Sequence, residues 1–185
     1  DDFMGEATQE VFAEEGAELI ADRSDLTRRD AADALITDAG HVDVLIANLA
    51  APTFSGIAAQ DLSDADWECA FNVMVHPLHR LTRAVLPQMI ERKAGKIVVY
   101  GSASALRGMR TLCAYSSARA AQVGYVQSVG VEVGPHNIQI NLIAQNYVQS
   151  EEYYPASLLA KESFQKSLKR QVPAGRLGAP REDAL

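Results

Sequence analysis

The sequence lacks the features that mark several classes of protein. It has only two cysteines, Cys69 and Cys113, and their spacing fits neither a disulfide framework nor a metal-binding motif. We therefore expect both to be reduced residues of the core. No apolar run is long enough to span a membrane, and no signal peptide can be recognised. These absences predict a cytoplasmic protein.

Positive charge is also scarce. The 17 Lys and Arg residues are outnumbered by 24 Asp and Glu residues, which gives a net charge of −7. Such a domain has no basic surface for nucleic acid and no electrostatic attraction to an anionic membrane. The four histidines are not part of a cysteine or carboxylate pattern that demands a metal: His41, His76, His79 and His136. We expect no nucleic acid, membrane or metal ion as a partner.

Aromatic residues make up only 6% of the 185 residues, whereas 48% are apolar. A core of Val, Ile, Leu and Ala with few aromatics suits an α/β protein better than a β-sandwich. The sequence contains no internal repeat and no linker rich in Gly, Pro or Ser. Length and uniform composition together predict one domain over residues 1–185.

Helical and strand patterns alternate along the chain. Such alternation predicts a Rossmann-like, doubly wound parallel sheet in a three-layer α/β/α domain. Ligands bind at the carboxyl ends of the strands in such sheets, which draws attention to Asn48, Ser102 and residues 144–146. The expected helices are 4–15, 28–39, 63–92, 112–133 and 156–170, and the expected strands are 17–21, 42–48, 95–103 and 138–144.

Ser102, Tyr115 and Arg119 form the most informative pattern. Ser102 closes a predicted strand, and the other two are four residues apart on the next predicted helix, so they share one face. Arg119 is permanently cationic, and a cation beside a phenol favours the ionised form. A tyrosine in that setting can act as a general base, while a serine donates to a substrate oxygen. On spacing alone, the same three residues also fit a purely structural role.

This pattern resembles the active site of the short-chain dehydrogenases/reductases, in which a Ser is followed by a Tyr and, four residues later, by a basic residue. Tyr115 comes thirteen residues after Ser102, and the order of elements is similar from Phe3 to about Asp183. The resemblance implies a catalytic role for the trio and the Rossmann-like fold of that family. It also implies that the family's first strand, last strand and C-terminal tail are missing from this chain.

Four positions depart from ordinary members of that family. Arg119 replaces the lysine that hydrogen-bonds the nicotinamide ribose, and Phe3 replaces the middle glycine of the turn that approaches the pyrophosphate. Met74 replaces an asparagine of the proton relay, and residues 144–147 replace a Pro-Gly pair after the strand. Together these departures indicate a proton-abstracting trio without a dinucleotide site. We therefore expect no cofactor.

The combination resembles the halohydrin dehalogenases, which use a Ser-Tyr-Arg trio, bind no nicotinamide and have an aromatic-x-Gly in place of the glycine turn. Phe3 and Gly5 match that motif, and residues 75–80, 96–102 and 143–145 are similar to one branch of the group. The resemblance implies a lyase that converts vicinal haloalcohols to epoxides with release of halide and a proton. In reverse, small anions would open epoxides.

The resemblance also implies further site residues and partners. The halide would bind beside Phe3 and the loop after the fourth predicted strand, where backbone N–H groups form an anion nest. The helices 63–92 and 112–133 would assemble the chain as a homotetramer. The implied halide-binding residues are Phe3, Gln145, Asn146, Tyr147 and Val148, and the implied substrate pocket is Pro52, Phe54 and Leu112.

Two other functions remain open at this point. One is an NAD(P)-dependent reductase that tolerates arginine in place of the catalytic lysine; Asp22 and Asp25, which follow the predicted strand 17–21, would then face the ribose. With Phe3 in the way of a dinucleotide, we interpret both aspartates as loop and cap residues. The other is a relative kept for oligomerisation without catalysis, against which the intact trio argues.

Overall fold

Three parallel strands form the sheet, in the order β1-β2-β3. They are β1 (Val44–Ala47), β2 (Gly95–Tyr100) and β3 (Ile138–Ile143). In the register, Leu45 of β1 is opposite Ile97 of β2, which is opposite Ile140 of β3. The structure is a computed structural model that describes residues 3–50 and 52–185, except for the side chain of Phe3. The predicted Rossmann-like parallel α/β fold is confirmed.

The chain divides into two units, which we name the core unit and the terminal unit. The core unit is residues 22–144 and contains the whole sheet, whereas the terminal unit combines the segment that ends at Ala21 with residues 145–185. The helices of the core unit are α2 (Ala31–Ala39), α3 (Asp64–Arg92) and α4 (Cys113–Val133). Short 3₁₀ helices lie at Ala59–Asp61, Ala103–Ala105 and Gly134–His136.

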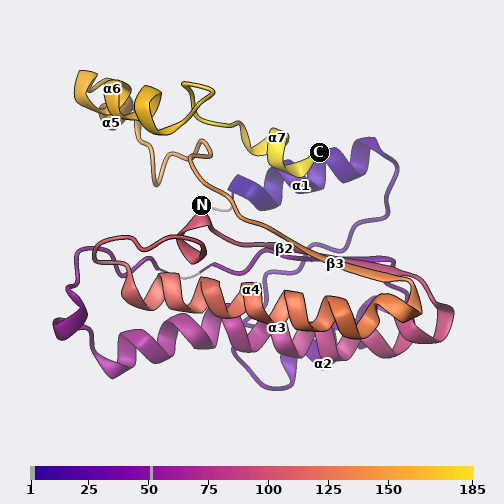
Figure 1. Cartoon of the computed structure of the whole chain (residues 1–185). Helices are drawn as coiled ribbons and strands as arrows, with labels where there is room; N and C mark the ends of the chain where they lie inside the picture. Colours follow the sequence, from indigo (N-terminus) through magenta and orange to yellow (C-terminus); the bar gives the residue numbers. More distant parts are fainter. Residues whose placement is uncertain (1–2, 51) are drawn as a thin grey trace. The chain divides into compact units, whose positions relative to one another are not determined.

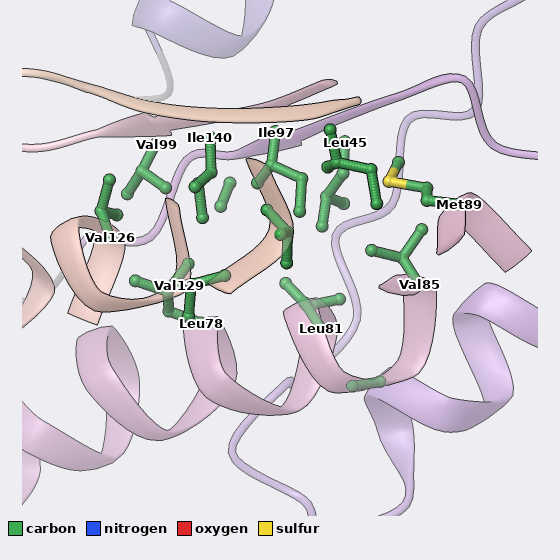
Figure 2. Packing of buried hydrophobic residues seen from close by; sticks show 14 of the residues in the cluster. Leu45, Leu78, Leu81, Val85, Met89, Ile97, Val99, Val126, Val129 and Ile140 are labelled. Atoms are coloured by element: carbon green, nitrogen blue, oxygen red, sulfur yellow. The ribbon is translucent and has the colours of Figure 1, made fainter. Parts of the chain in front are cut away.

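The core unit buries its apolar residues between the sheet and the pair α3 and α4, which run side by side along one face of the sheet (Figure 1). Strand residues alternate between this buried layer and the other face, as the period of a strand requires. Figure 2 shows the strand and helix side chains meeting in that layer. Its members include Leu45, Leu78, Leu81, Val85, Met89, Ile97, Val99, Val126, Val129 and Ile140.

The long helix α3 follows its predicted limits closely. Ser63 caps its first turn: the hydroxyl oxygen accepts from the Asp66 N–H at 3.1 Å and donates to the Asp66 carboxylate at 2.7 Å. The helix contains Pro77 and Pro87 and ends at Lys93, whose backbone is left-handed. Local capping signals were therefore enough to locate the start of this helix.

The terminal unit consists of short helices. They are α1 (Phe3–Glu14), α5 (Ala156–Leu159), α6 (Glu162–Gln171) and α7 (Pro180–Ala184). Arg181 of α7 forms an ion pair with Glu14 of α1. A single parallel bridge joins Val148 to Gly178, so two segments of this unit that lie 30 residues apart run together.

Three predicted elements need correction, and Cys113, expected in the core, is exposed. Residues 17–21 form no strand: Leu19 and Ile20 are exposed, and no described strand lies beside them to satisfy their backbone groups. The strand predicted over 95–103 ends at Tyr100, because the chain turns there into a 3₁₀ helix. The helix predicted over 156–170 is broken into α5 and α6, and the Gln165 side chain donates to the last carbonyl of α5, that of Leu159.

Within the described ranges, none of the helices combines the length and the apolar composition that crossing a bilayer requires.

Candidate active site

Ser102 lies two residues beyond β2, at the carboxyl end of the sheet, and caps the 3₁₀ helix that follows. Its Oγ accepts from the Ser104 N–H at 3.2 Å and from the Ser104 hydroxyl at 2.9 Å. Two accepted bonds occupy both lone pairs, so the Ser102 proton is free to donate to a ligand. Gly101 makes room for this turn, because a Cβ there would lie 2.5 Å from the Leu142 side chain.

Tyr115 and Arg119 lie one turn apart on α4, and the predicted shared face is confirmed. The guanidinium carbon of Arg119 is 5.1 Å from the centroid of the Tyr115 ring. Arg119 is only 6% exposed, whereas Tyr115 is half-buried. A cation at this distance from an aromatic ring is attracted to it and, when shielded from water, interacts with it strongly. Tyr115 therefore combines access to ligands with a buried positive neighbour.

Arg119 is held from two sides at one nitrogen. Its Nη1 donates to the Tyr100 carbonyl at 2.7 Å and to Oε1 of Gln122 at 3.0 Å. Gln122 in turn donates from Nε2 to the Met74 carbonyl at 2.9 Å. The end of β2 and a turn of α3 are thus both connected to the cation, which fixes its position relative to α4.

Two residues of this network were missed by the sequence analysis, namely Ser104 and Gln122. A signal for Gln122 was present: it interrupts an apolar face of α4 made by Ala114, Ala118 and Val126. A polar side chain at such a position needs partners within the protein. Ser104 gave no comparable signal, because a serine in a turn is ordinary and only its burial and its bonds to Ser102 distinguish it.

The three residues predicted to line the substrate pocket differ in their burial. Phe54 is half-buried and packs in the same apolar cluster as Met74 and Tyr115. Leu112 is half-buried at the N-terminus of α4, three residues before Tyr115. Pro52 is exposed. The cluster around Tyr115 therefore includes Phe54, and Met74 contributes a fully buried side chain where an asparagine was expected from the family.

The predicted halide-binding loop lies in the terminal unit. Tyr147 has a left-handed backbone with φ of 56°, and its carbonyl accepts from the Gly178 N–H at 2.9 Å. Within the described part of the chain, the backbone N–H groups of residues 146–148 have no acceptor. Successive free amides around a left-handed residue can form an anion nest. The side chain of Phe3, also predicted here, lies outside what the structure describes.

The side chains of the same loop are largely engaged. Gln145 donates from Nε2 to the Asp183 carboxylate at 2.8 Å, and Tyr147 donates from its hydroxyl to Gln171 at 2.5 Å. Asn146 is exposed, and Val148 is buried. Tyr147 also stacks on Tyr154, whose pKa is raised to about 12, chiefly because burial disfavours the phenolate. The side chains of Gln145 and Tyr147 are thus engaged, and the backbone groups of residues 146–148 and the exposed Asn146 side chain are the donors that stay available in this loop.

Groups that would face a dinucleotide in the parent family make hydrogen bonds within this protein. Asp22 accepts from the Ser24 N–H and hydroxyl, and Asp25 does the same with Thr27, so both carboxylates serve local turns as predicted. Nη1 of Arg119, at the position of the ribose-binding lysine, points to protein acceptors. Among the residues that the structure describes, no cluster of three or more His, Cys, Asp or Glu side chains offers a metal site either.

Comparisons with known proteins point in two directions. Residues 2–170 match the family described as short chain dehydrogenase. Dehydrogenase/reductase SDR family member 6 of Danio rerio is 31% identical over 98% of this chain and 82% of its own length. A solved structure of a dehalogenation enzyme is also 31% identical, with a TM-score of 0.85, over 98% of this chain and 83% of that one. A halohydrin dehalogenase bound to ethyl (2S)-oxiran-2-ylacetate is 27% identical, with a TM-score of 0.78, over 98% and 74%.

Proposed function

The chain belongs to the short-chain dehydrogenase family, and we propose that within this family it is a halohydrin dehalogenase that works without a nicotinamide cofactor. The observation that carries the proposal is the buried guanidinium of Arg119, anchored at Nη1 by protein acceptors and placed 5.1 Å from the Tyr115 ring. The similarity to two dehalogenating proteins over 98% of the chain supports it.

The first step proposed is removal of a proton from the hydroxyl of a vicinal haloalcohol. Ser102 donates its free hydroxyl proton to the substrate oxygen, since its own oxygen accepts from Ser104. Tyr115, as the phenolate, takes the substrate proton as general base and becomes the neutral phenol, and the Arg119 cation stabilises the phenolate from which the reaction starts. The resulting alkoxide stays hydrogen-bonded to Ser102 until it reacts.

In the second step the alkoxide oxygen forms a bond to the neighbouring carbon from the side opposite the halogen. The carbon–halogen bond breaks, and its electron pair leaves with the halide, so the products are an epoxide and a halide ion. We assign stabilisation of the halide to the terminal unit, at the free backbone amides of residues 146–148. Gln145 and Phe3 complete the proposed anion site, and Phe54, Leu112 and Pro52 the proposed substrate pocket.

The test is incubation of the protein with a short bromo- or chloroalcohol in the absence of any cofactor, with halide and proton release followed together. The expected result is equal release of both, which stops when Tyr115 is replaced by Phe. Tyr125→Phe is the matched control, because Tyr125 lies on the same helix, is also half-buried and has no part in the proposed chemistry. Absence of halide release by the unaltered protein would contradict the proposal.

A second candidate is an NAD(P)-dependent reductase, and the similarity to a vertebrate dehydrogenase/reductase favours it. In that case Tyr115 would donate a proton to a carbonyl oxygen while the cofactor supplies hydride. The two functions are separated by one assay, in which NADPH and a panel of ketones are offered to the same preparation. Oxidation of NADPH together with no release of halide would establish the reductase instead.

A further inference from the structure

Gln122 has no part in the chemistry proposed above, yet its polar side chain is buried, which costs free energy. It lies three residues after Arg119 on α4, and it is 0% exposed. The buried residues one turn to either side, Ala118 and Val126, are apolar. Burial of an amide costs free energy unless its donor and acceptor groups find partners, so its hydrogen bonds should explain its presence.

Only one orientation of the Gln122 amide satisfies both of its neighbours. A guanidinium can only donate hydrogen bonds, and a peptide carbonyl can only accept them. Oε1 therefore faces Arg119 Nη1 at 3.0 Å, and Nε2 faces the Met74 carbonyl at 2.9 Å. Through this amide the cation on α4 is tied to the backbone of α3.

The Met74 carbonyl lies in a turn of α3 that contains Pro77. A proline inside a helix provides no N–H for the carbonyl four residues earlier, that of Val73, and its ring crowds that carbonyl. Pro77 thus removes the helical donor of the Val73 carbonyl, one residue before Met74, and the Met74 carbonyl beside it accepts from a donor on another helix. The Nε2 group of Gln122 is that donor.

Arg119 depends on this partner in a way that a lysine would not. Nη1 carries two N–H groups, and they match its two acceptors, Tyr100 and Gln122. Nε of Arg119 has no partner among the described residues, so the two hydrogen bonds at Nη1 fix the guanidinium. Without Gln122, one N–H of a buried cation would be unsatisfied and the group could turn about the bond to Tyr100.

We propose that Gln122 is a positioning residue that holds the Arg119 guanidinium against the Tyr115 ring and thereby allows an arginine to serve in place of a lysine in this site. The inference rests on the proposed function, because it gives Gln122 a role in the same proton transfer. A neutral acceptor suits the role, since a carboxylate at this position would cancel the charge that stabilises the phenolate.

The test compares Gln122→Met, which keeps the length of the side chain and removes both hydrogen bonds, with Gln127→Met, the same change at an exposed position of α4. For halide release, Gln122→Met should lower kcat by about 10- to 100-fold, the effect of one lost hydrogen bond to a charged group. KM should change less than about twofold, since Arg119 acts on the reacting tyrosine and not on binding. Gln127→Met should leave both constants unchanged. A folded Gln122→Met protein with the kcat of the unaltered protein would overturn the inference.

Gln122→Glu provides a second variant in case Gln122→Met fails to fold. It keeps the volume and the acceptor that faces Arg119 but loses the donor that faces the Met74 carbonyl and adds a negative charge, which the Arg119 cation beside it partly compensates. The expected result is a fall in kcat of at least about tenfold, because the guanidinium is then paired with an anion. A kcat equal to that of the unaltered protein would contradict the requirement for a neutral acceptor and with it the inference.

A spectroscopic readout makes the result independent of catalysis. In ¹⁵N-labelled protein, an anchored guanidinium gives separate Nη signals, and those of Arg119 can be assigned by their loss in Arg119→Lys. They should merge in Gln122→Met and stay separate in Gln127→Met. If the unaltered protein releases no halide but the signals merge as expected, the proposed reaction is wrong and the positioning role stands. If halide is released and the signals do not change in Gln122→Met, the positioning role is wrong and the reaction stands.

Discussion

The proposed functional residues of the core unit and those of the terminal unit are held in different ways. In the core unit, Arg119 and Gln122 are buried and hydrogen-bonded to each other and to the backbones of β2 and α3. In the terminal unit, the proposed anion site consists of backbone amides in a loop, near side chains that are exposed or half-buried. Proton transfer needs a charge in a fixed place, which burial provides, whereas a loop can present N–H groups to anions of several sizes.

The same contrast appears in how each unit is stabilised. The core unit has an apolar layer that joins three strands to α3 and α4, with several side chains at 0% exposure, among them Leu78 and Ile97. The terminal unit has few fully buried apolar residues, such as Met4 and Leu168, and several exposed ion pairs. Exposed pairs add little stability, so the terminal unit is expected to open more easily.

The largest expected effect is on the rate of halide release, through Tyr115 in the core unit. Tyr115→Phe should lower kcat for halide release by about 10²- to 10⁴-fold, the usual contribution of a general base. The half-buried ring is retained, so the melting temperature should stay close to that of the unaltered protein. Steady-state kinetics and thermal unfolding measured on the same preparation check this. A loss of activity that is matched by unfolding would not support the role as base.

A pair of leucine truncations compares the stability of the two units. Leu78→Ala in the core layer should lower the free energy of unfolding by about 2–5 kcal/mol, through lost burial and the cavity that remains. Leu168→Ala removes the same atoms from α6, in which Leu168 is the one buried residue. The surroundings of such a site can relax into the space, so the free energy of unfolding should fall by less than about 2 kcal/mol. Denaturant unfolding of both variants gives the difference. Equal losses would show that the two units are packed alike.

The anion loop can be tested through its backbone at Tyr147, which has φ of 56°. Tyr147→Gly keeps this conformation accessible, so bromide should inhibit ring closure with an inhibition constant within about threefold of the original. Tyr147→Pro removes the N–H and fixes φ near −65°, and inhibition by bromide should weaken by about tenfold or more. If glycine weakens inhibition as much as proline does, the Tyr147 side chain and not the backbone holds the anion.

The smallest expected effect is a loss of folding stability at low pH that originates in the terminal unit. Hydrogen bonds from Arg176 and from the Ala179 N–H lower the pKa of Glu182 from its ordinary value of 4.5 to about 2. A lowered carboxyl pKa stabilises the folded state above 4.5, and this contribution is lost as the pH falls from 4.5 to about 2. Because both side chains of the pair are exposed, the change in melting temperature should be small and further reduced by salt. Glu182→Gln should remove this change in melting temperature with pH. An unchanged pH dependence in that variant would exclude the pair of Arg176 and Glu182 as the origin.

Much of the fold could be predicted because its signals are local. The start of α3 follows from a serine cap and an acidic residue three positions later, and the buried face of α4 follows from helical spacing of its apolar residues. The strand predicted at residues 17–21 failed for the opposite reason. A strand exists only where a neighbour pairs with it, and pairing is a property of distant segments that an apolar run does not reveal.

By itself, the sequence determined that Tyr115 and Arg119 share a helix face one turn apart and that Ser102 follows a strand, since helical period and strand length act over a few residues. Only the tertiary structure decided that Arg119 is buried and held by Tyr100 and Gln122, because those bonds join β2, α3 and α4. The acceptors are mostly backbone carbonyls, which every residue has. Whether a given carbonyl can accept a bond from Arg119 or Gln122 depends on how the elements pack, so no sequence motif indicates it.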